Sequence, residues 1–251
     1  TTSSTITFTV NGANDAPTAS NNTVTTNEDT TYTFTASDFG FSDVDGDTLS
    51  SVTVSALSGS DGTFLLNGVA ITGSTSVTKT QIDSGLLTFV PDSNENGSSY
   101  NTFTFTVNDG TTDSASSYTM TVDVTAVNDA PTASNNTVTT NEDTDHTFAA
   151  SEFGFTDVDG DSLDHVSIET LPSNGTLLLS GSAVSAGDQI SAANISNLVF
   201  RPAANANGAS YDTFTFTVND GTTDSASSYT MTVNVTAVND APTASNNTVT
   251  T

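Results

Sequence analysis

The chain has 251 residues, a length that suits about two small domains. It carries 29 acidic residues against 2 basic ones, for a formal charge of −27, and it has no cysteine. So acidic a chain is not expected to bind nucleic acid, whose phosphates need a basic surface. It has no apolar run long enough to span a membrane, so insertion into a bilayer is not expected either. The absence of cysteine excludes disulfides and thiolate metal sites.

The first residues match the end of a longer repeated unit. The segment ITFTVNGANDAP, which begins at Ile6, aligns with MTVDVTAVNDAP, which begins at Met120. We therefore expect residues 1–13 to be the last strand of a preceding repeat, with the strand itself at Ile6–Val10.

The tetrapeptide NDAP marks the start of each unit. It ends at Pro17, Pro131 and Pro242, so the spacings are 114 (131 − 17) and 111 (242 − 131) residues. Residues 213–251 repeat residues 102–140 with one change, from Asp123 to Asn234. A period of this length predicts whole small domains at 14–127 and 128–238, followed at 239–251 by the first strand of another repeat that includes Val249.

Within each unit, apolar residues alternate with Thr, which is the pattern of half-buried strands. The alternating runs lie at 32–36, 103–107 and 118–124 in the first unit and at 214–218 and 229–235 in the second. Turn sequences such as DVDGD and NDG separate them, and helical turns are expected only at 38–42 and near 191–195. About seven short strands per unit predict an all-β fold of two tandem antiparallel β-sandwiches.

Acidic residues recur at matching places in the two units. They follow the first strand, fill the DVDGD turn, precede the last strand and accompany Asn in each linker. Carboxylates two residues apart in a turn repel each other unless a cation lies between them, and Lys and Arg are almost absent. Carboxylate and amide oxygens are the hard ligands that Ca²⁺ prefers, whereas softer ions favour His or Cys. The turn is not an EF-hand, because Gly46 and Gly160 fall at its fourth position rather than its sixth.

In order, the motifs NDAP, NEDT, DVDGD, P-x-x-N-x-N-G, FTFTVNDG and TVxVTAVNDAP resemble the bacterial cadherin-like tandem repeat. That family includes the VCBS-type and Ig-like repeats of large secreted adhesins exported by type I secretion. The resemblance covers both units and both terminal segments. It implies seven-stranded Greek-key sandwiches, end-to-end stacking of repeats and Ca²⁺ at the domain junctions.

The resemblance also implies which residues hold the ions. The complete central junction would draw on Glu28, Asn128, Asp129, Asp157, Asp159, Asp161 and Asp220. An outer site would use Asn14, Asp15, Asp43, Asp45, Asp47 and Asp109, and a weaker one Glu142 and Asp240. Whether Asp92 and Glu95 also coordinate metal stays open, because unit two has Arg201, Ala203 and Asn205 in that region.

The function expected from these features is that of a calcium-rigidified extender in a bacterial surface adhesin, acting outside the cell in adhesion and biofilms. Its partners would be the neighbouring repeats of the same chain. The chain is expected to be monomeric, apart from homophilic or crystal contacts through the terminal segments. Calcium would neutralise the junction carboxylates and stiffen the linker.

Two other functions are less consistent with the sequence. A carbohydrate- or protein-binding module would show exposed aromatic rings, but the chain has no Trp, and Tyr100 and Tyr211 are expected at the edge of the core. An enzyme is not expected, because His146 and His165 have no counterpart in the first unit, where Tyr32 and Ser51 stand. Both histidines are therefore expected at the surface of strands or turns.

Overall fold

The computed structural model describes residues 3–8, 12–58, 61–242 and 244. It divides into two compact units, unit 1 (Thr1–Val127) and unit 2 (Asn128–Thr251). Residues 3–8 form no strand. The rest of the expected strand at Ile6–Val10 and the one that includes Val249 lie outside the described residues.

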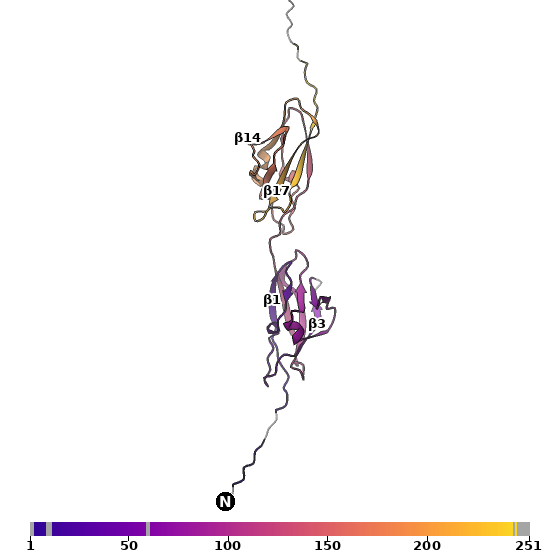
Figure 1. The fold of residues 1–251 in the computed structure, drawn as a ribbon, viewed down its shortest axis with the longest axis vertical. Coiled ribbons are helices and arrows are strands. Elements are labelled where there is room, and N and C mark those ends of the chain that lie inside the picture. Colours follow the sequence, from indigo (N-terminus) through magenta and orange to yellow (C-terminus); the bar gives the residue numbers. More distant parts are fainter. Residues whose placement is uncertain (1–2, 9–11, 59–60, 243, 245–251) are drawn as a thin grey trace, which may run out of the picture. The chain divides into compact units, whose positions relative to one another are not determined.

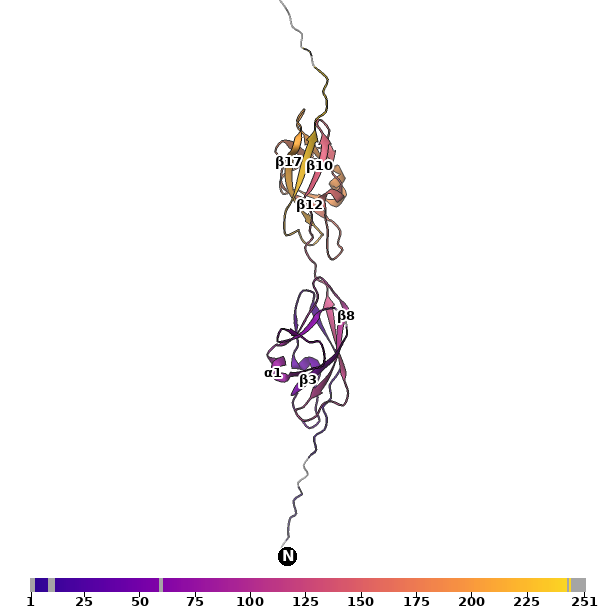
Figure 2. The ribbon, with the colours of Figure 1, turned by 90° about the vertical axis from the view of Figure 1, so that its right-hand side faces the viewer.

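The regular secondary structure of unit 1 consists almost entirely of β-strands (Figure 1). Its strands are β1 (Asn22–Asn27), β2 (Tyr32–Thr33), β3 (Ser51–Ser58), β4 (Thr63–Leu66), β5 (Val69–Ala70), β6 (Thr75–Thr78), β7 (Leu87–Val90), β8 (Gly97–Asn108) and β9 (Tyr118–Thr125). The 3₁₀ helix η1 (Ala36–Phe39) and the helix α1 (Lys79–Asp83) interrupt them, and Figure 2 labels α1.

Unit 2 repeats this order of elements. Its strands are β10 (Asn136–Asn141), β11 (His146–Thr147), β12 (His165–Thr170), β13 (Gly175–Leu179), β14 (Ser182–Ala183), β15 (Gln189–Ser191), β16 (Leu198–Pro202), β17 (Gly208–Asn219) and β18 (Tyr229–Thr236). Two 3₁₀ helices, η2 (Ala150–Phe153) and η3 (Ala192–Asn197), complete it. None of the helices in the described part of the chain is long and apolar enough to cross a bilayer.

Each unit is a sandwich of two sheets, which confirms the predicted fold class. Unit 1 has one sheet in the order β1-β9-β8-β3-β6 and another in the order β2-β7-β4-β5. Unit 2 has the matching sheets β10-β18-β17-β12-β15 and β11-β16-β13-β14, and Figure 2 shows β10, β17 and β12 of the larger one. Thus the described residues form nine strands per unit rather than seven, because the short β2, β5, β11 and β14 add to the longer ones.

The first and last strands of each unit pair in parallel, which is a departure from the expected antiparallel sandwich. Thr23 lies opposite Thr121 in unit 1, and Thr137 lies opposite Thr232 in unit 2. The chain end of each unit is thereby fixed beside its first strand. This pairing places the residue after β1, Glu28, beside the end of β9, where its N–H donates to the carbonyl oxygen of Thr125 at 2.9 Å.

The alternation of apolar residues and Thr is explained by the cores. In β8 the fully buried Phe103, Phe105 and Val107 alternate with partly exposed Thr, and β17 does the same with Phe214, Phe216 and Val218. Several ring pairs lie edge-to-face, such as Phe64 and Phe103 with an angle of 79° between the rings, which is a geometry that aromatic pairs prefer. Among the described residues, ten phenylalanines are the largest of the fully buried side chains, so their rings fill much of the space between the two sheets of each unit.

Candidate metal centres

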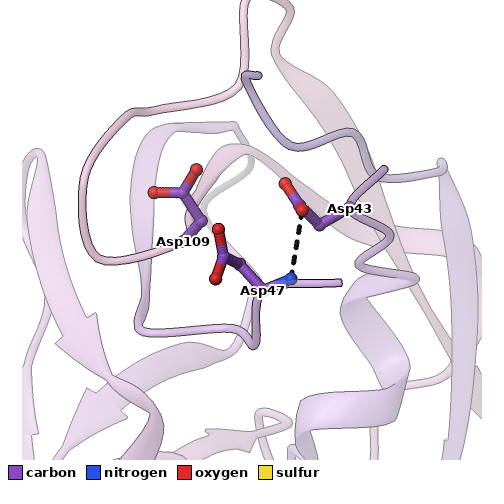
Figure 3. A group of neighbouring side chains, drawn as sticks. All are labelled: Asp43, Asp47 and Asp109. Carbon is purple, nitrogen blue, oxygen red and sulfur yellow. Dashed lines mark hydrogen bonds between the residues drawn. The ribbon is translucent and has the colours of Figure 1, made fainter. Parts of the chain in front are cut away.

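Three carboxylates of unit 1 meet at one end of its sandwich, and we call them the acidic cluster of unit 1. Asp43, Asp47 and Asp109 each offer an oxygen within 4.8 Å of the others. Figure 3 shows the three side chains pointing toward a common space, although Asp43 and Asp47 come from the turn before β3 and Asp109 from the turn after β8. The backbone N–H groups of Asp45 and Asp47 donate to Oδ1 of Asp43, at 2.8 and 3.1 Å, and hold the turn closed.

Unit 2 has an acidic cluster at the equivalent place. It consists of Asp157, Asp159 and Asp161, whose oxygens also lie within 4.8 Å of one another. The N–H of Asp161 donates to Oδ1 of Asp157 at 3.0 Å, as in unit 1. The clusters differ in one member, since Asp220 does not join the triplet of unit 2 whereas Asp109 joins that of unit 1.

The Asn-Asp pair before the first strand of each unit is hydrogen-bonded to acidic residues of that unit. In unit 2 the N–H of Asp129 donates to Oδ2 of Asp159 at 2.7 Å, and Nδ2 of Asn128 donates to Oδ2 of Asp220 at 3.0 Å. In unit 1 Asp15 and Asn14 make the same bonds to Asp45 and Asp109, at 2.7 and 3.0 Å. The structure therefore brings each Asn-Asp pair together with the acidic turn with which the sequence analysis grouped it.

The carboxylates of Asp109 and Asp220 are held by their own loops. Oδ1 of Asp220 accepts the N–H groups of Thr222 and Thr223, each at 2.6 Å. Burial raises the pKa of Asp220, but the hydrogen bonds from Thr223, Asn128 and Thr222 outweigh it, so the pKa lies below its ordinary value. The hydrogen bond from Asn14, followed by those from Thr112 and Thr111, likewise lowers the pKa of Asp109. Both groups are thus kept in the charged form that binds cations.

One oxygen in each cluster has no partner. Oδ2 of Asp43 and Oδ2 of Asp157 are buried atoms that accept no hydrogen bond within the described residues. An unpaired buried carboxylate oxygen is costly, because it has lost water and gained nothing in return. A hard cation surrounded by carboxylates would satisfy it, so the donor set fits Ca²⁺.

Glu28 and Glu142 are members of neither cluster and are almost fully buried, at 2% and 5% exposure. Oε1 of Glu28 accepts the N–H of Val127 at 2.5 Å, and Oε1 of Glu142 accepts that of Val238 at 2.6 Å. Each carboxylate is therefore fixed to a residue that lies two positions after the last strand of its unit.

Sequence reasoning missed the partners of these two glutamates. Nδ2 of Asn96 donates to Glu28 at 3.4 Å, and Nδ2 of Asn207 donates to Glu142 at 2.9 Å. Both asparagines belong to the P-x-x-N-x-N-G motif, which is present in both units and so could have pointed to them.

The remaining candidates do not form a cluster with Glu28 among the described residues. Oε2 of Glu95 accepts the hydroxyl of Tyr100 at 3.0 Å, and the N–H of Asp92 donates to the same hydroxyl at 3.3 Å. Burial, with the neighbouring Glu95, raises the pKa of Tyr100 to about 12. Asp240 is exposed, and Nδ2 of Asn239 donates to its carbonyl oxygen at 3.2 Å.

The expectation that both histidines are surface positions of strands or turns holds only in part, because each lies in a strand but its side chain is partly buried. The side chains of His146 and His165 are only 16% and 14% exposed. His146 lies edge-on against Phe148 and contacts Oε2 of Glu152 at 3.2 Å, while His165 contacts Asp164. Each stands at the start of a strand, where the side chain turns inward beside a carboxylate.

Comparisons with known proteins agree with this fold. A family model described as bacterial Ig domain matches the chain twice, at residues 14–125 and 128–236. No curated protein sequence matches the chain.

Among solved structures, human protocadherin-24 EC1-2 is similar with a TM-score of 0.52 and 18% identity, over 91% of this chain and 100% of that one. Drosophila N-cadherin EC1-4 is similar with a TM-score of 0.45 and 16% identity, over 90% of this chain and 50% of that one. The endo-fucoidan hydrolase MfFcnA4 of glycoside hydrolase family 107 has a TM-score of 0.29 and 19% identity. The chain covers 30% of the length of that enzyme, with 92% of its own residues aligned.

Proposed function

Because the chain belongs to the bacterial Ig domain family and consists of two tandem cadherin-like sandwiches, we propose that it is a calcium-rigidified extender of a large bacterial surface adhesin. The observation that carries the proposal is the pair of buried, unpartnered oxygens of Asp43 and Asp157, each inside a group of acidic residues. Only 2 of the 251 residues are Lys or Arg, so the protein itself offers these groups almost no counter-charge.

The proposed ions would be held by the acidic clusters together with the Asn-Asp pair before the first strand of each unit. In unit 2 these are Asp157, Asp159 and Asp161, with Asn128, Asp129 and Asp220 beside them. Calcium would supply the positive charge that the carboxylates lack and replace their mutual repulsion by shared coordination.

Extracellular modules of this kind bind Ca²⁺ at about 10⁻⁴–10⁻³ M, so the sites would be empty in the cytosol and filled outside the cell. We therefore place the protein at the bacterial surface, where filling would follow export.

The proposal includes a role for Glu28 as the ligand that couples the units. Its carboxylate binds the N–H of Val127, and the next residue of the chain, Asn128, binds Asp220 of unit 2. An ion that engaged Glu28 as well as the unit 2 residues would restrict the Val127–Asn128 linker. Glu142 has the same local contacts in unit 2 and serves as the matched control.

The alternative of a sugar-binding module finds little support in the aromatic residues. All five tyrosines pack against the two cores, and Tyr100 lies edge-on to Phe89 with ring centroids 6.1 Å apart. The exposed aromatic platform on which a sugar ring would stack is therefore lacking in the described parts of both sandwiches.

Calcium titration calorimetry on the whole chain tests the proposal. We expect binding that Asp159→Ala weakens at least tenfold and that Glu28→Gln weakens more than Glu142→Gln does. Absence of calcium binding, or an unchanged isotherm for Asp159→Ala, would show that the clusters are only solvated turns. Equal effects of the two glutamate variants would remove Glu28 from the coupling role while leaving the cluster sites in place.

A further inference from the structure

His165 is a largely buried imidazole that is oriented by a carboxylate. It opens β12, its side chain is 14% exposed, and its Nδ1 lies 2.8 Å from Oδ2 of Asp164. A carboxylate oxygen accepts hydrogen bonds, so Nδ1 carries the proton in the neutral ring and Nε2 presents its lone pair.

That lone pair has no hydrogen-bond donor. Nε2 of His165 is buried and unpartnered within the described residues, and Oδ1 of Asp224, which lies 3.9 Å away, is also an acceptor. Two acceptors that face each other repel, so a positive charge between them would be stabilised.

The width of the gap discriminates between the possible occupants. A separation of 3.9 Å is too long for a direct hydrogen bond. A bridging water would need the two atoms roughly 4.5 Å apart, because each of its hydrogen bonds spans about 2.8 Å. A zinc ion needs about 2.1 Å to nitrogen and about 2.1 Å to oxygen, which places the two atoms roughly 3.4–4.2 Å apart depending on the angle.

We propose that Nε2 of His165 and Oδ1 of Asp224 bind a zinc-class divalent transition metal in unit 2. Imidazole and carboxylate are ligands for such ions, and water would complete the coordination. Asp164 would be the positioning residue, since metal-binding histidines commonly donate their other N–H to a carboxylate. The site is separate from the acidic cluster of unit 2, whose members contribute only oxygen.

Hydrogen bonds within its loop hold Asp224 in place. Nδ2 of Asn219 donates to Oδ1 of Asp224 at 2.8 Å, and Oδ1 of Asn219 accepts the N–H of Gly221 at 2.7 Å. Asp220 belongs to the same loop. A metal between His165 and Asp224 would therefore tie β12 to the loop that holds a candidate calcium ligand.

Unit 1 provides a natural reference for this site. It keeps the loop, with Nδ2 of Asn108 donating to Oδ1 of Asp113 at 2.7 Å, but it has Ser50 and Ser51 where unit 2 has Asp164 and His165. Serine is therefore the natural substitution for Asp164 or His165, because the same fold already accommodates serine at both equivalent positions of unit 1.

The test is a zinc titration of the whole chain in saturating calcium, followed by calorimetry and by the ¹⁵N resonances of the imidazoles. We expect Zn²⁺ to shift the Nε2 resonance of His165, and His165→Ser to abolish that binding. Asp164→Ser should weaken it about ten- to a hundredfold, as loss of an orienting partner usually does. His146→Tyr, which introduces the residue of unit 1, should leave it unchanged.

Three results would overturn the proposal. They are the absence of zinc binding in saturating calcium, equal binding by wild type and His165→Ser, and an Nε2 resonance that responds to pH but not to zinc. The last result would identify a proton as the occupant. This test does not depend on the calcium proposal, because it compares the zinc binding of wild type with that of His165→Ser under the same conditions.

Discussion

The two carboxylate oxygens of Asp157 differ in their hydrogen bonding. Oδ1 accepts the N–H of Asp161 at 3.0 Å, while Oδ2 is buried without a hydrogen-bond partner in the described structure. The same division holds for Asp43 in unit 1. The sequence could predict that these acids gather in a turn, but which oxygen is deprived of water depends on the packing of the turn against the linker.

This division predicts opposite effects of Asp157→Asn with and without calcium. In chelator the free energy of unfolding of the variant should equal that of wild type or exceed it by up to about 1 kcal/mol. The reason is that the substitution removes a charge that neighbouring carboxylates repel and that water solvates poorly. In calcium it should lose affinity at least tenfold. Urea unfolding and calorimetry measure the two effects, with the exposed Glu169→Gln as a control for net charge. Destabilisation in chelator without loss of calcium affinity would contradict the assignment.

Asp212 shows a carboxylate that the repeat pattern did not reveal. It is 5% exposed and accepts the N–H groups of Ser173, Asn174 and Gly175, at 2.9, 2.7 and 2.8 Å. Unit 1 has Asn101 at this position, so the acid does not recur and could not be recognised by alignment of the units.

The free energy of unfolding of unit 2 should fall by about 2–4 kcal/mol in Asp212→Ala, because several buried donors lose a charged acceptor together. Asp212→Asn should cost less, since unit 1 tolerates the amide. Urea denaturation that resolves the two units measures both variants. Equal losses for Ala and Asn would mean that the charge, rather than the acceptor geometry, provides the stability.

At the scale of elements, the runs of alternating Phe and Thr were predictable because burial of one sheet face imposes a period of two. The helix α1 was not predicted. Its signal was nevertheless present, since Thr78 and Gln81 form a capping box in which each side chain bonds to the backbone of the other residue. The parallel pairing of β1 with β9 could not be read from local sequence, because it joins residues almost a whole domain apart.

The end of η2 gives a prediction for a single element. Gly154 has φ = 59°, and a Cβ there would lie 2.2 Å from Oγ of Ser134. Gly154→Ala should therefore cost about 1–3 kcal/mol from backbone strain, and more from the clash. Gly181→Ala is the control, with φ = 84° but no atom within 4 Å of the added Cβ. If thermal unfolding shows equal losses for both variants, close packing against Ser134 contributes nothing.

For the whole molecule, lowering the pH has two opposing effects on the stability of the folded protein. Protonation reduces the self-repulsion of a chain with formal charge −27, but it also removes hydrogen-bonded carboxylates such as Asp109 and Asp220. Because the pKa of both groups is lowered in the folded protein, their contribution is present above the unfolded value of about 3.9 and is lost as pH falls through the folded values.

The calcium-free chain with Asp109→Asn and Asp220→Asn should consequently lose less stability than wild type when the pH is lowered below about 4. Urea unfolding at a series of pH values measures the free energy of unfolding of both proteins. Both gain from the reduced charge repulsion at low pH, so this gain cancels when one free energy is subtracted from the other. Parallel curves for the two proteins would show that these carboxylates contribute no pH dependence.

The central claim is that calcium stiffens this pair of domains, and small-angle X-ray scattering of the whole chain tests it most directly. We predict a larger maximum dimension and a narrower distribution of distances in millimolar Ca²⁺ than in chelator, with Asp159→Ala and Glu28→Gln reducing the difference. Identical scattering in calcium and in chelator would contradict the account.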